Sequence, residues 1–233
     1  MSAQPDAVLV SGDLAEHATD EEYEQVRELL APLRVPLHVL PGNHDDRRAL
    51  RRHFGVPGAG ADPVQYSVDL GPLRLVVVDT TRPGEDPGAL DAERLDWLDA
   101  ELSAAPERST LLAMHHPPIL TGVPAWDEVG LPVADRRALS EVLERHRQVR
   151  RLVAGHVHRT ITANLAGCAV LTVPSTYAQF RLTLGSQEDE LAAEPAGFAV
   201  HAVFEGELIS HVQPVPNDAL GYGGGGIRTH GAL

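Results

Sequence analysis

The segment Leu152-Val153-Ala154-Gly155-His156-Val157-His158 joins a short apolar run to two histidines that are one residue apart. The apolar run predicts a buried strand, and a glycine at its end allows the backbone to turn. Each imidazole is then free to face a metal ion. A His-x-His pair is also typical of two solvated residues at a sheet edge, so this segment alone leaves both interpretations open.

Three further segments have the same construction, an apolar run that ends in small and metal-ligating residues. They are Ala7–Asp13, Leu37–Asp45 and Leu111–Pro118. Continuous apolar runs of this kind, bounded by glycine and proline, predict buried strands with both faces covered. Open α/β sheets bind ligands at the carboxyl ends of such strands. We therefore expect four strand ends to bring aspartate, asparagine and histidine side chains to one metal site.

In chain order the four strand ends carry the motifs Gly-Asp, Gly-Asn-His-Asp, His-His-Pro-Pro and Gly-His-x-His. These motifs lie at residues 12–13, 42–45, 115–118 and 155–158. The ordered set resembles that of the calcineurin-like metallophosphoesterase superfamily, and within it the bacterial branch of class III cyclic-nucleotide phosphodiesterases and glycerophosphodiesterases. The resemblance extends from about residue 8 to about residue 215. It implies an α/β fold in which a two-sheet β-sandwich is flanked by helices (αββα), and a metal-dependent hydrolase of small phosphodiesters.

The resemblance also implies which residues bind metal. Asp13 resembles the carboxylate that bridges two metal ions. Asn43, His115 and His156 resemble the remaining ligands of one ion, and His158 resembles a ligand of the other. An anionic oxygen suits the bridging position, and neutral imidazole suits zinc, iron or manganese. The implied cofactors are therefore divalent Mn, Fe or Zn ions, two of them in the intact family.

Three other residues near these motifs, His44, His116 and Trp126, are not among the implied metal ligands. His44 resembles the catalytic histidine that lies beside the phosphate, where it would stabilise the phosphate oxygens or protonate the leaving alkoxide. His116 and Trp126 carry no implied role. Trp126 could stack on a base, but we expect it to pack against apolar neighbours, and we expect His116 to pack or to support the ligands.

The resemblance is incomplete at the N-terminus. In the family an Asp-x-His motif on the first strand adds ligands to the ion that His158 binds, and no Asp-x-His precedes Asp13. We interpret the chain as N-terminally truncated, with one complete metal site and weak or absent turnover. The alternative left open is a catalytically impaired metal-binding remnant or scaffold of the same fold. A barrel-type zinc amidohydrolase also uses His-x-His, but there the pair belongs on the first strand. Here the pair comes two-thirds of the way along the chain, which argues against a barrel.

The composition predicts a single domain that acts on a small substrate. The chain has 233 residues, 43% of them hydrophobic, and a formal net charge of −14. So acidic a chain does not suit a protein that tracks a nucleic-acid polymer, because such proteins need a basic surface. The single cysteine, Cys168, and the lack of a long apolar run predict a cytoplasmic protein without a membrane partner. We expect one domain over residues 1–215 and a flexible glycine-rich tail over residues 216–233, and we leave a homodimer open.

Periodicity predicts the elements between the motifs. A capping box at Thr19 begins a helix that Pro32 ends, and apolar spacing predicts further helices near residues 92–102 and 136–146. Strands are expected at residues 64–70, 73–79, 161–165, 169–173, 198–204 and 208–212, the last two forming a hairpin. The glycine- and proline-rich segment 82–88 is expected to be a mobile loop, and segment 185–197 a surface excursion or a short linker.

Overall fold

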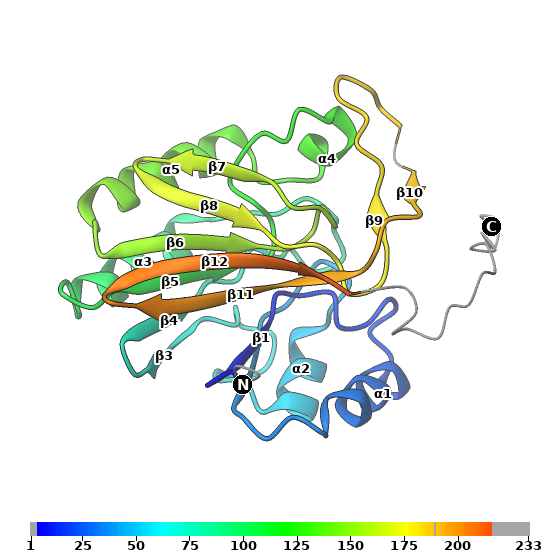
Figure 1. Ribbon diagram of the computed structural model, residues 1–233, viewed down its shortest axis with the longest axis horizontal. Coiled ribbons are helices and arrows are strands. Elements are labelled where there is room, and N and C mark those ends of the chain that lie inside the picture. Colours follow the sequence, from blue (N-terminus) through cyan, green and yellow to red (C-terminus); the bar gives the residue numbers. More distant parts are fainter. Residues whose placement is uncertain (1–3, 189, 216–233) are drawn as a thin grey trace.

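A six-stranded mixed sheet forms the central layer of the computed structural model, which describes residues 4–188 and 190–215 (Figure 1). Its strand order is β3-β4-β5-β6-β8-β7, with β4, β5, β6 and β8 parallel and β3 and β7 antiparallel at the edges. The bounds are β3 (Tyr66–Leu70), β4 (Leu73–Val77), β5 (Thr110–Met114), β6 (Val149–Ala154), β7 (Thr162–Leu165) and β8 (Cys168–Thr172). Because β5 and β6 run side by side in the same direction, the motifs that follow them meet at one edge of the sheet.

A second β layer covers one face of the central sheet. Its strands are β1 (Val8–Val10), β2 (Leu37–Val39), β11 (Gly197–Phe204) and β12 (Glu207–Pro214). The parallel pair β1-β2 and the antiparallel hairpin β11-β12 form two separate sheets. Leu9 of β1 and Leu208 of β12 pack in one apolar cluster with Leu75 and Val153 of the central sheet. The predicted two-sheet sandwich is therefore confirmed, with its second layer divided into two pairs.

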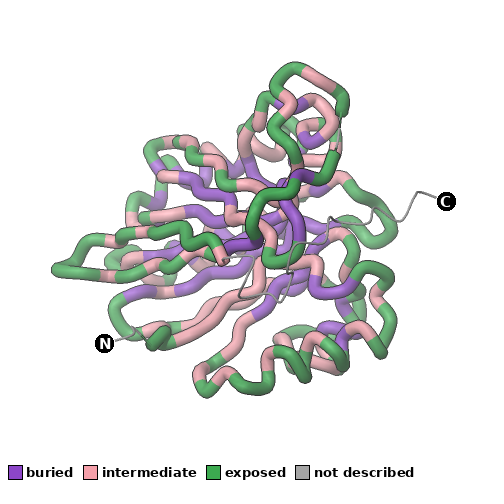
Figure 2. The backbone as a smooth tube through the Cα atoms, turned by 45° about the vertical axis from the view of Figure 1, so that its right-hand side comes forward, coloured by how far each residue is buried: buried purple, intermediate pink, exposed green. Residues whose placement is uncertain are grey.

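Helices cover the outer face of the central sheet and that of the β1-β2 pair. On the central sheet, α3 (Ala92–Ser103) and α5 (Val133–Arg145) bury Leu98 and Leu139 against strand residues such as Leu112. On the β1-β2 pair, α1 (Asp20–Leu30) and α2 (Arg47–Phe54) bury a cluster of their own. The members of that cluster include Tyr23, Val39, Ala49 and Leu50. Figure 2 shows the resulting pattern, with buried residues along the inner strands, exposed residues at the loop tips and a mixture of both along the helices.

Two helix starts show how local sequence fixes the layer next to the motifs. At α1 the predicted capping box is present, since the Thr19 side chain accepts from the Glu22 N–H and Glu22 bonds back to the Thr19 N–H. At α2 the Asp46 side chain accepts from the Ala49 N–H at 2.8 Å, and Gly55 ends the helix with a φ of 66°. The sequence did not predict α2, because only eight residues, four of them arginine, follow the cap.

The remaining elements are short. They are α4 (Pro124–Glu128), β9 (Gln179–Phe180) and β10 (Leu191–Ala192). Trp126 of α4 is buried with Val123, Val157 and Phe180, which confirms the expected packing role. Cys168 is buried and free. Over residues 4–188 and 190–215, no helix has the length and apolar character that crossing a membrane requires. The predicted tail at residues 216–233 lies outside the described residues.

Candidate metal centre

Four predicted ligand residues meet where β1, β2, β5 and β6 end. The Nε2 atom of His115 lies 3.1 Å from Asp13 Oδ2 and 3.1 Å from Asn43 Oδ1. The Nδ1 atom of His156 lies 3.1 Å from the same Asn43 oxygen. Atoms bound to one ion at about 2.1 Å lie roughly 3.0–3.5 Å apart in octahedral or tetrahedral coordination. The spacing of these four side chains therefore fits one divalent transition-metal ion.

The tautomer of His115 adds a second, independent indication of a cation. Its Nδ1 lies 2.8 Å from the carbonyl oxygen of Ser11, and a carbonyl can only accept, so Nδ1 carries the proton. In the neutral ring Nε2 then presents a lone pair to the oxygens of Asp13 and Asn43, which also carry lone pairs. Three lone pairs at this spacing need a positive charge between them, supplied either by a second proton on His115 or by a metal ion.

The electrostatics of the same atoms agree with this requirement. Burial opposes the charge on Asp13, but the charge and hydrogen bond of His115 together with those of His44 outweigh it and hold the pKa of Asp13 well below its usual range. Burial would also lower the pKa of His115, and the charge of Asp13 raises that pKa instead. For His156 the charge of Asp13 is outweighed, and burial together with the nearby His115 lowers its pKa to about 3. His156 is therefore a neutral imidazole at physiological pH, as a metal ligand must be.

The backbone around these residues is held in conformations that side chains rarely adopt. Asp13, His156 and His158 have positive φ angles of 55°, 67° and 44°. Left-handed backbone at a non-glycine residue costs on the order of 1–3 kcal/mol and persists where the surroundings impose it, commonly at functional sites. Gly42 is needed for a different reason, because any Cβ there would overlap the Asp13 carboxylate.

Comparison with known proteins identifies the family to which this chain belongs. Residues 2–160 match the family described as Calcineurin-like phosphoesterase. The chain belongs to this family. A probable glycerophosphodiester phosphodiesterase GpdQ of Arcobacter nitrofigilis is 33% identical over 204 residues, which cover 86% of this chain and 74% of the relative. The 3′,5′-cyclic adenosine monophosphate phosphodiesterase CpdA of Pseudomonas aeruginosa is 34% identical over 75% of this chain and 62% of its own length.

Solved structures confirm the fold of this calcineurin-like phosphoesterase. A purple acid phosphatase from yellow lupin superposes with a TM-score of 0.67 at 17% identity, over 90% of this chain and 44% of that structure. A dimetal phosphatase from Danio rerio superposes with a TM-score of 0.61 at 20% identity, over 72% of both chains. At these identities the likeness concerns the fold alone.

His44, the predicted catalytic histidine of this calcineurin-like phosphoesterase, lies beside the four converging side chains. Its backbone N–H donates to Asp13 Oδ1 at 3.1 Å, which fixes the free oxygen of that carboxylate toward His115. Its ring Nδ1 lies 3.1 Å from the carbonyl oxygen of Glu16 and therefore donates to it. The side chain of His44 is 39% exposed, so the ring is accessible from solvent.

His158 occupies a different position from the other predicted ligands. Its ring stacks on Phe180, with the ring centroids 4.7 Å apart and the planes at 15°. Phe180 is held in turn by Arg159, whose Nη1 donates to the Phe180 carbonyl at 2.7 Å. The role of His158 as a ligand of a second ion stays a prediction, as do the metal-binding roles of the other four residues.

His116 is buried beside the predicted ligands, and hydrogen bonds occupy both of its nitrogens. One nitrogen each of His115, His116 and His156 lies within 4.8 Å of the others, which by itself would suggest three histidine ligands. However, His116 Nδ1 lies 2.8 Å from Thr80 Oγ1, and Nε2 lies 3.0 Å from the carbonyl of Asp86. Nε2 must donate to that carbonyl, so Nδ1 accepts from the hydroxyl and no lone pair is left for a metal. The expected supporting role of His116 agrees with this geometry.

Asp45 is a half-buried carboxylate for which the sequence suggested no role. It accepts hydrogen bonds from the Gly42 N–H at 2.9 Å, the Leu14 N–H at 3.2 Å and the Tyr23 hydroxyl at 3.1 Å. It therefore joins the loop after β1 to the loop after β2, which carry Asp13 and Asn43. Burial raises the pKa of Asp45 to about 6. The only sequence signal was the acidic residue that closes the Gly-Asn-His-Asp motif.

Proposed function

We propose that this calcineurin-like phosphoesterase hydrolyses a small phosphodiester, either a 3′,5′-cyclic nucleotide or a glycerophosphodiester. The observation that carries the proposal is the convergence of Asp13, Asn43, His115 and His156 with 3.1 Å spacings that suit a divalent ion. The names of two relatives support the substrate class, since one is called a probable glycerophosphodiester phosphodiesterase and the other a cyclic adenosine monophosphate phosphodiesterase.

The proposed metal ligands have distinct tasks. The Asp13 carboxylate supplies negative charge, while the amide oxygen of Asn43 adds a neutral donor and the two imidazoles supply the softer nitrogen donors that Mn, Fe and Zn accept. When bound, a divalent ion supplies Lewis-acid activation of the phosphate and of the attacking water. The chain has a net charge of −14, which repels an anionic substrate. A divalent ion held by these residues would supply the local positive charge that such a substrate needs.

His44 is the proposed proton donor. Because the Nδ1 proton is committed to the Glu16 carbonyl, the imidazolium form of His44 would deliver its second proton from Nε2 and would be left as a neutral ring with the proton on Nδ1. Protonation of the departing alkoxide avoids the release of a strongly basic group and contributes about 100- to 10,000-fold in typical enzymes. The backbone N–H of His44 meanwhile holds the Asp13 carboxylate, so the residue is tied to the metal site as well as to the substrate.

The proposal is tested by hydrolysis of bis(p-nitrophenyl) phosphate, cyclic AMP and glycerophosphocholine with added Mn²⁺, together with metal analysis of the protein. We expect diester hydrolysis that Mn²⁺ stimulates, and we expect His44→Ala to reduce kcat by about 100-fold or more while metal content is kept. The matched control is His211→Ala, because His211 is an exposed histidine on β12. Metal binding without hydrolysis of any diester would contradict the proposal and favour a metal-binding scaffold of the same fold.

Two finer points belong to the same proposal. A cytoplasmic location is supported by the single buried thiol of Cys168 and would be tested by cell fractionation.

A homodimer is supported by three apolar side chains that alternate along β11 and are exposed, namely Phe198, Val200 and Phe204. Light scattering of the purified protein would test the homodimer.

A further inference from the structure

Asn43 poses a problem that a carboxylate ligand would not pose. Its amide carries an oxygen and a nitrogen of nearly the same size, and only the oxygen can bind a cation. A rotation of the amide by half a turn would direct two N–H donors at the ion and abolish the ligand. Some neighbour must therefore distinguish the nitrogen from the oxygen.

We propose that Asp86 is a positioning residue that fixes the orientation of the Asn43 amide. Asn43 Nδ2 donates a hydrogen bond of 3.5 Å to Asp86 Oδ1, while Asn43 Oδ1 faces His115 and His156. In the rotated amide, the oxygen of Asn43 would face the carboxylate of Asp86, and two acceptors would repel each other. The inference rests on the metal site of the proposed function and names a residue that controls it.

The backbone of Asp86 is held in place by His116. The ring of His116 donates from Nε2 to the Asp86 carbonyl at 3.0 Å and accepts at Nδ1 from the Thr80 hydroxyl. The backbone N–H of His116 donates to the same hydroxyl oxygen at 3.1 Å, so Thr80 is fixed as well. Gly88 lies against the other side of this contact, where a Cβ would approach the His116 ring to 2.6 Å. One histidine thus connects strand β5 to the segment that carries Asp86.

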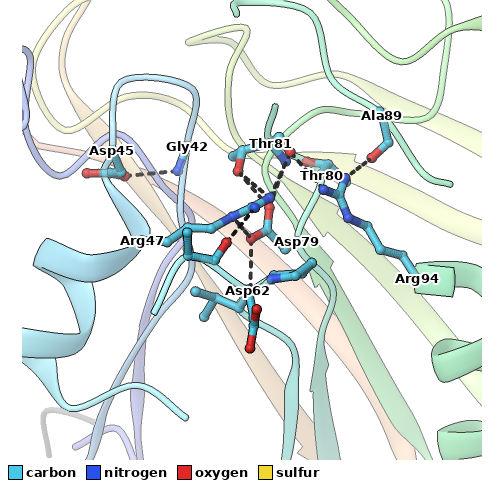
Figure 3. A network of polar contacts seen from close by, with 12 residues as sticks. Gly42, Asp45, Arg47, Asp62, Asp79, Thr80, Thr81, Ala89 and Arg94 are labelled. Atoms are coloured by element: carbon cyan, nitrogen blue, oxygen red, sulfur yellow. Dashed lines mark hydrogen bonds and ion pairs between the residues drawn. The ribbon is translucent and has the colours of Figure 1, made fainter. Parts of the chain in front are cut away.

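Two buried arginines hold the ends of the same segment, and one of them, Arg47, begins the helix that follows the loop of Asn43 (Figure 3). Arg47, at the start of α2, pairs with Asp79 at 2.8 Å and donates to the Thr81 carbonyl at 2.9 Å. Arg94 of α3 donates to the Thr81 and Ala89 carbonyls at 3.1 Å and 2.9 Å. Both arginines donate to the Thr81 carbonyl, so this buried group has two hydrogen-bond partners.

These contacts change the interpretation of segment 82–88. From its glycine and proline content we expected a mobile loop, whereas the structure fastens it at both ends and through His116. A fastened loop can hold one carboxylate at a defined place, which a mobile loop could not do. Glu85, one residue before Asp86, does not share this task, because its carboxylate pairs with Arg82.

The test measures Mn²⁺ affinity by calorimetry and metal content after dialysis, with no substrate present. We expect Asp86→Ala to weaken Mn²⁺ binding by about tenfold, since loss of a group that orients a ligand typically has a 10- to 100-fold effect. Asp86→Asn keeps an acceptor oxygen and should remain within about threefold of the wild type. Glu85→Ala is the matched control, because it removes the same charge from the same loop, and it should bind like the wild type.

A second test uses the Asn43→Asp variant, in which the two terminal side-chain atoms no longer differ. In Asn43→Asp both terminal atoms are oxygen, so adding Asp86→Ala should no longer weaken Mn²⁺ binding. Wild-type affinity in Asp86→Ala would overturn the inference. Equal losses in Asp86→Ala and Asp86→Asn would also overturn it, because charge rather than hydrogen bonding would then act. Absence of Mn²⁺ binding in the wild type would instead contradict the proposed function, so the two failures are distinguishable.

Discussion

Strands β5 and β6 each end in two histidines, and the two pairs are held in different ways. After β5, His115 and His116 are adjacent and almost fully buried, and side-chain hydrogen bonds fix both rings. After β6, His156 and His158 are one residue apart and both have left-handed backbone. The first pair is positioned by the partners of its nitrogens, and the second by the path of the main chain.

The difference shows how one edge of the central sheet can supply both the proposed metal ligands and the residues that hold neighbouring loops in place. Adjacent residues of an extended chain point to opposite sides, so β5 sends His115 toward Asp13 and His116 toward Thr80. Residues two apart would normally point to the same side. The positive φ angles at His156 and His158 alter that rule, and their rings reach different neighbours, Asn43 and Phe180.

The largest effect is expected from His115→Ala. This change removes the imidazole that faces both Asp13 and Asn43, and we expect Mn²⁺ affinity to fall by more than about 100-fold, beyond the usual effect of losing an orienting group. Metal analysis after dialysis and the rate of diester hydrolysis are the measurements. His211→Ala again serves as the control, and near-normal metal content in His115→Ala would place the metal elsewhere.

A smaller effect is expected from His116→Phe, which keeps a ring of similar shape. The buried Thr80 hydroxyl and the Asp86 carbonyl lose a partner, so the free energy of unfolding should fall by about 2 kcal/mol. Mn²⁺ affinity should fall by about tenfold through Asp86. Urea unfolding and calorimetry measure the two effects, and Thr80→Ser, which keeps the hydroxyl, is the control. Lost stability with unchanged affinity would show that His116 only packs.

The smallest effect is expected from Phe180→Leu, which removes the ring stacked on His158. The free energy of unfolding should fall by about 1 kcal/mol, the usual value of an aromatic pair. Mn²⁺ binding at Asp13, Asn43, His115 and His156 should not change. Phe198→Leu is the control, because Phe198 lies exposed on β11. A large loss of affinity at the first metal site would mean that the two histidine pairs are not independent.

The sequence predicted those parts of the fold and site that short segments determine. Apolar runs that end in ligand residues identified strands β1, β2, β5 and β6, because a buried parallel strand and its terminal loop are contiguous in the chain. The capping box at Thr19 located the start of α1 for the same reason. The parallel pairing of β1 with β2 and of β5 with β6 explains why Asp13 lies near Asn43 and His115 near His156, although the two pairs belong to different layers.

The sequence could not predict what depends on contacts between distant segments. The partners of His116 lie 36 and 30 residues away, at Thr80 and Asp86. Nothing in the local pattern of residues 82–88 indicates that buried arginines would fasten that segment. The tautomer of His115 depends on a carbonyl 104 residues earlier, and left-handed backbone at His156 appears in no periodicity. Each of these features belongs to the assembled site rather than to one element.

The bond from His115 to the Ser11 carbonyl has a consequence for how the protein tolerates genetic change. The acceptor is a main-chain atom, so a codon change at position 11 can alter the serine side chain without deleting the oxygen that sets the tautomer. The support of Asn43 is a side chain, which a single nucleotide change can remove. Single substitutions can therefore change the orientation of the proposed amide ligand more readily than the tautomer of the proposed imidazole ligand.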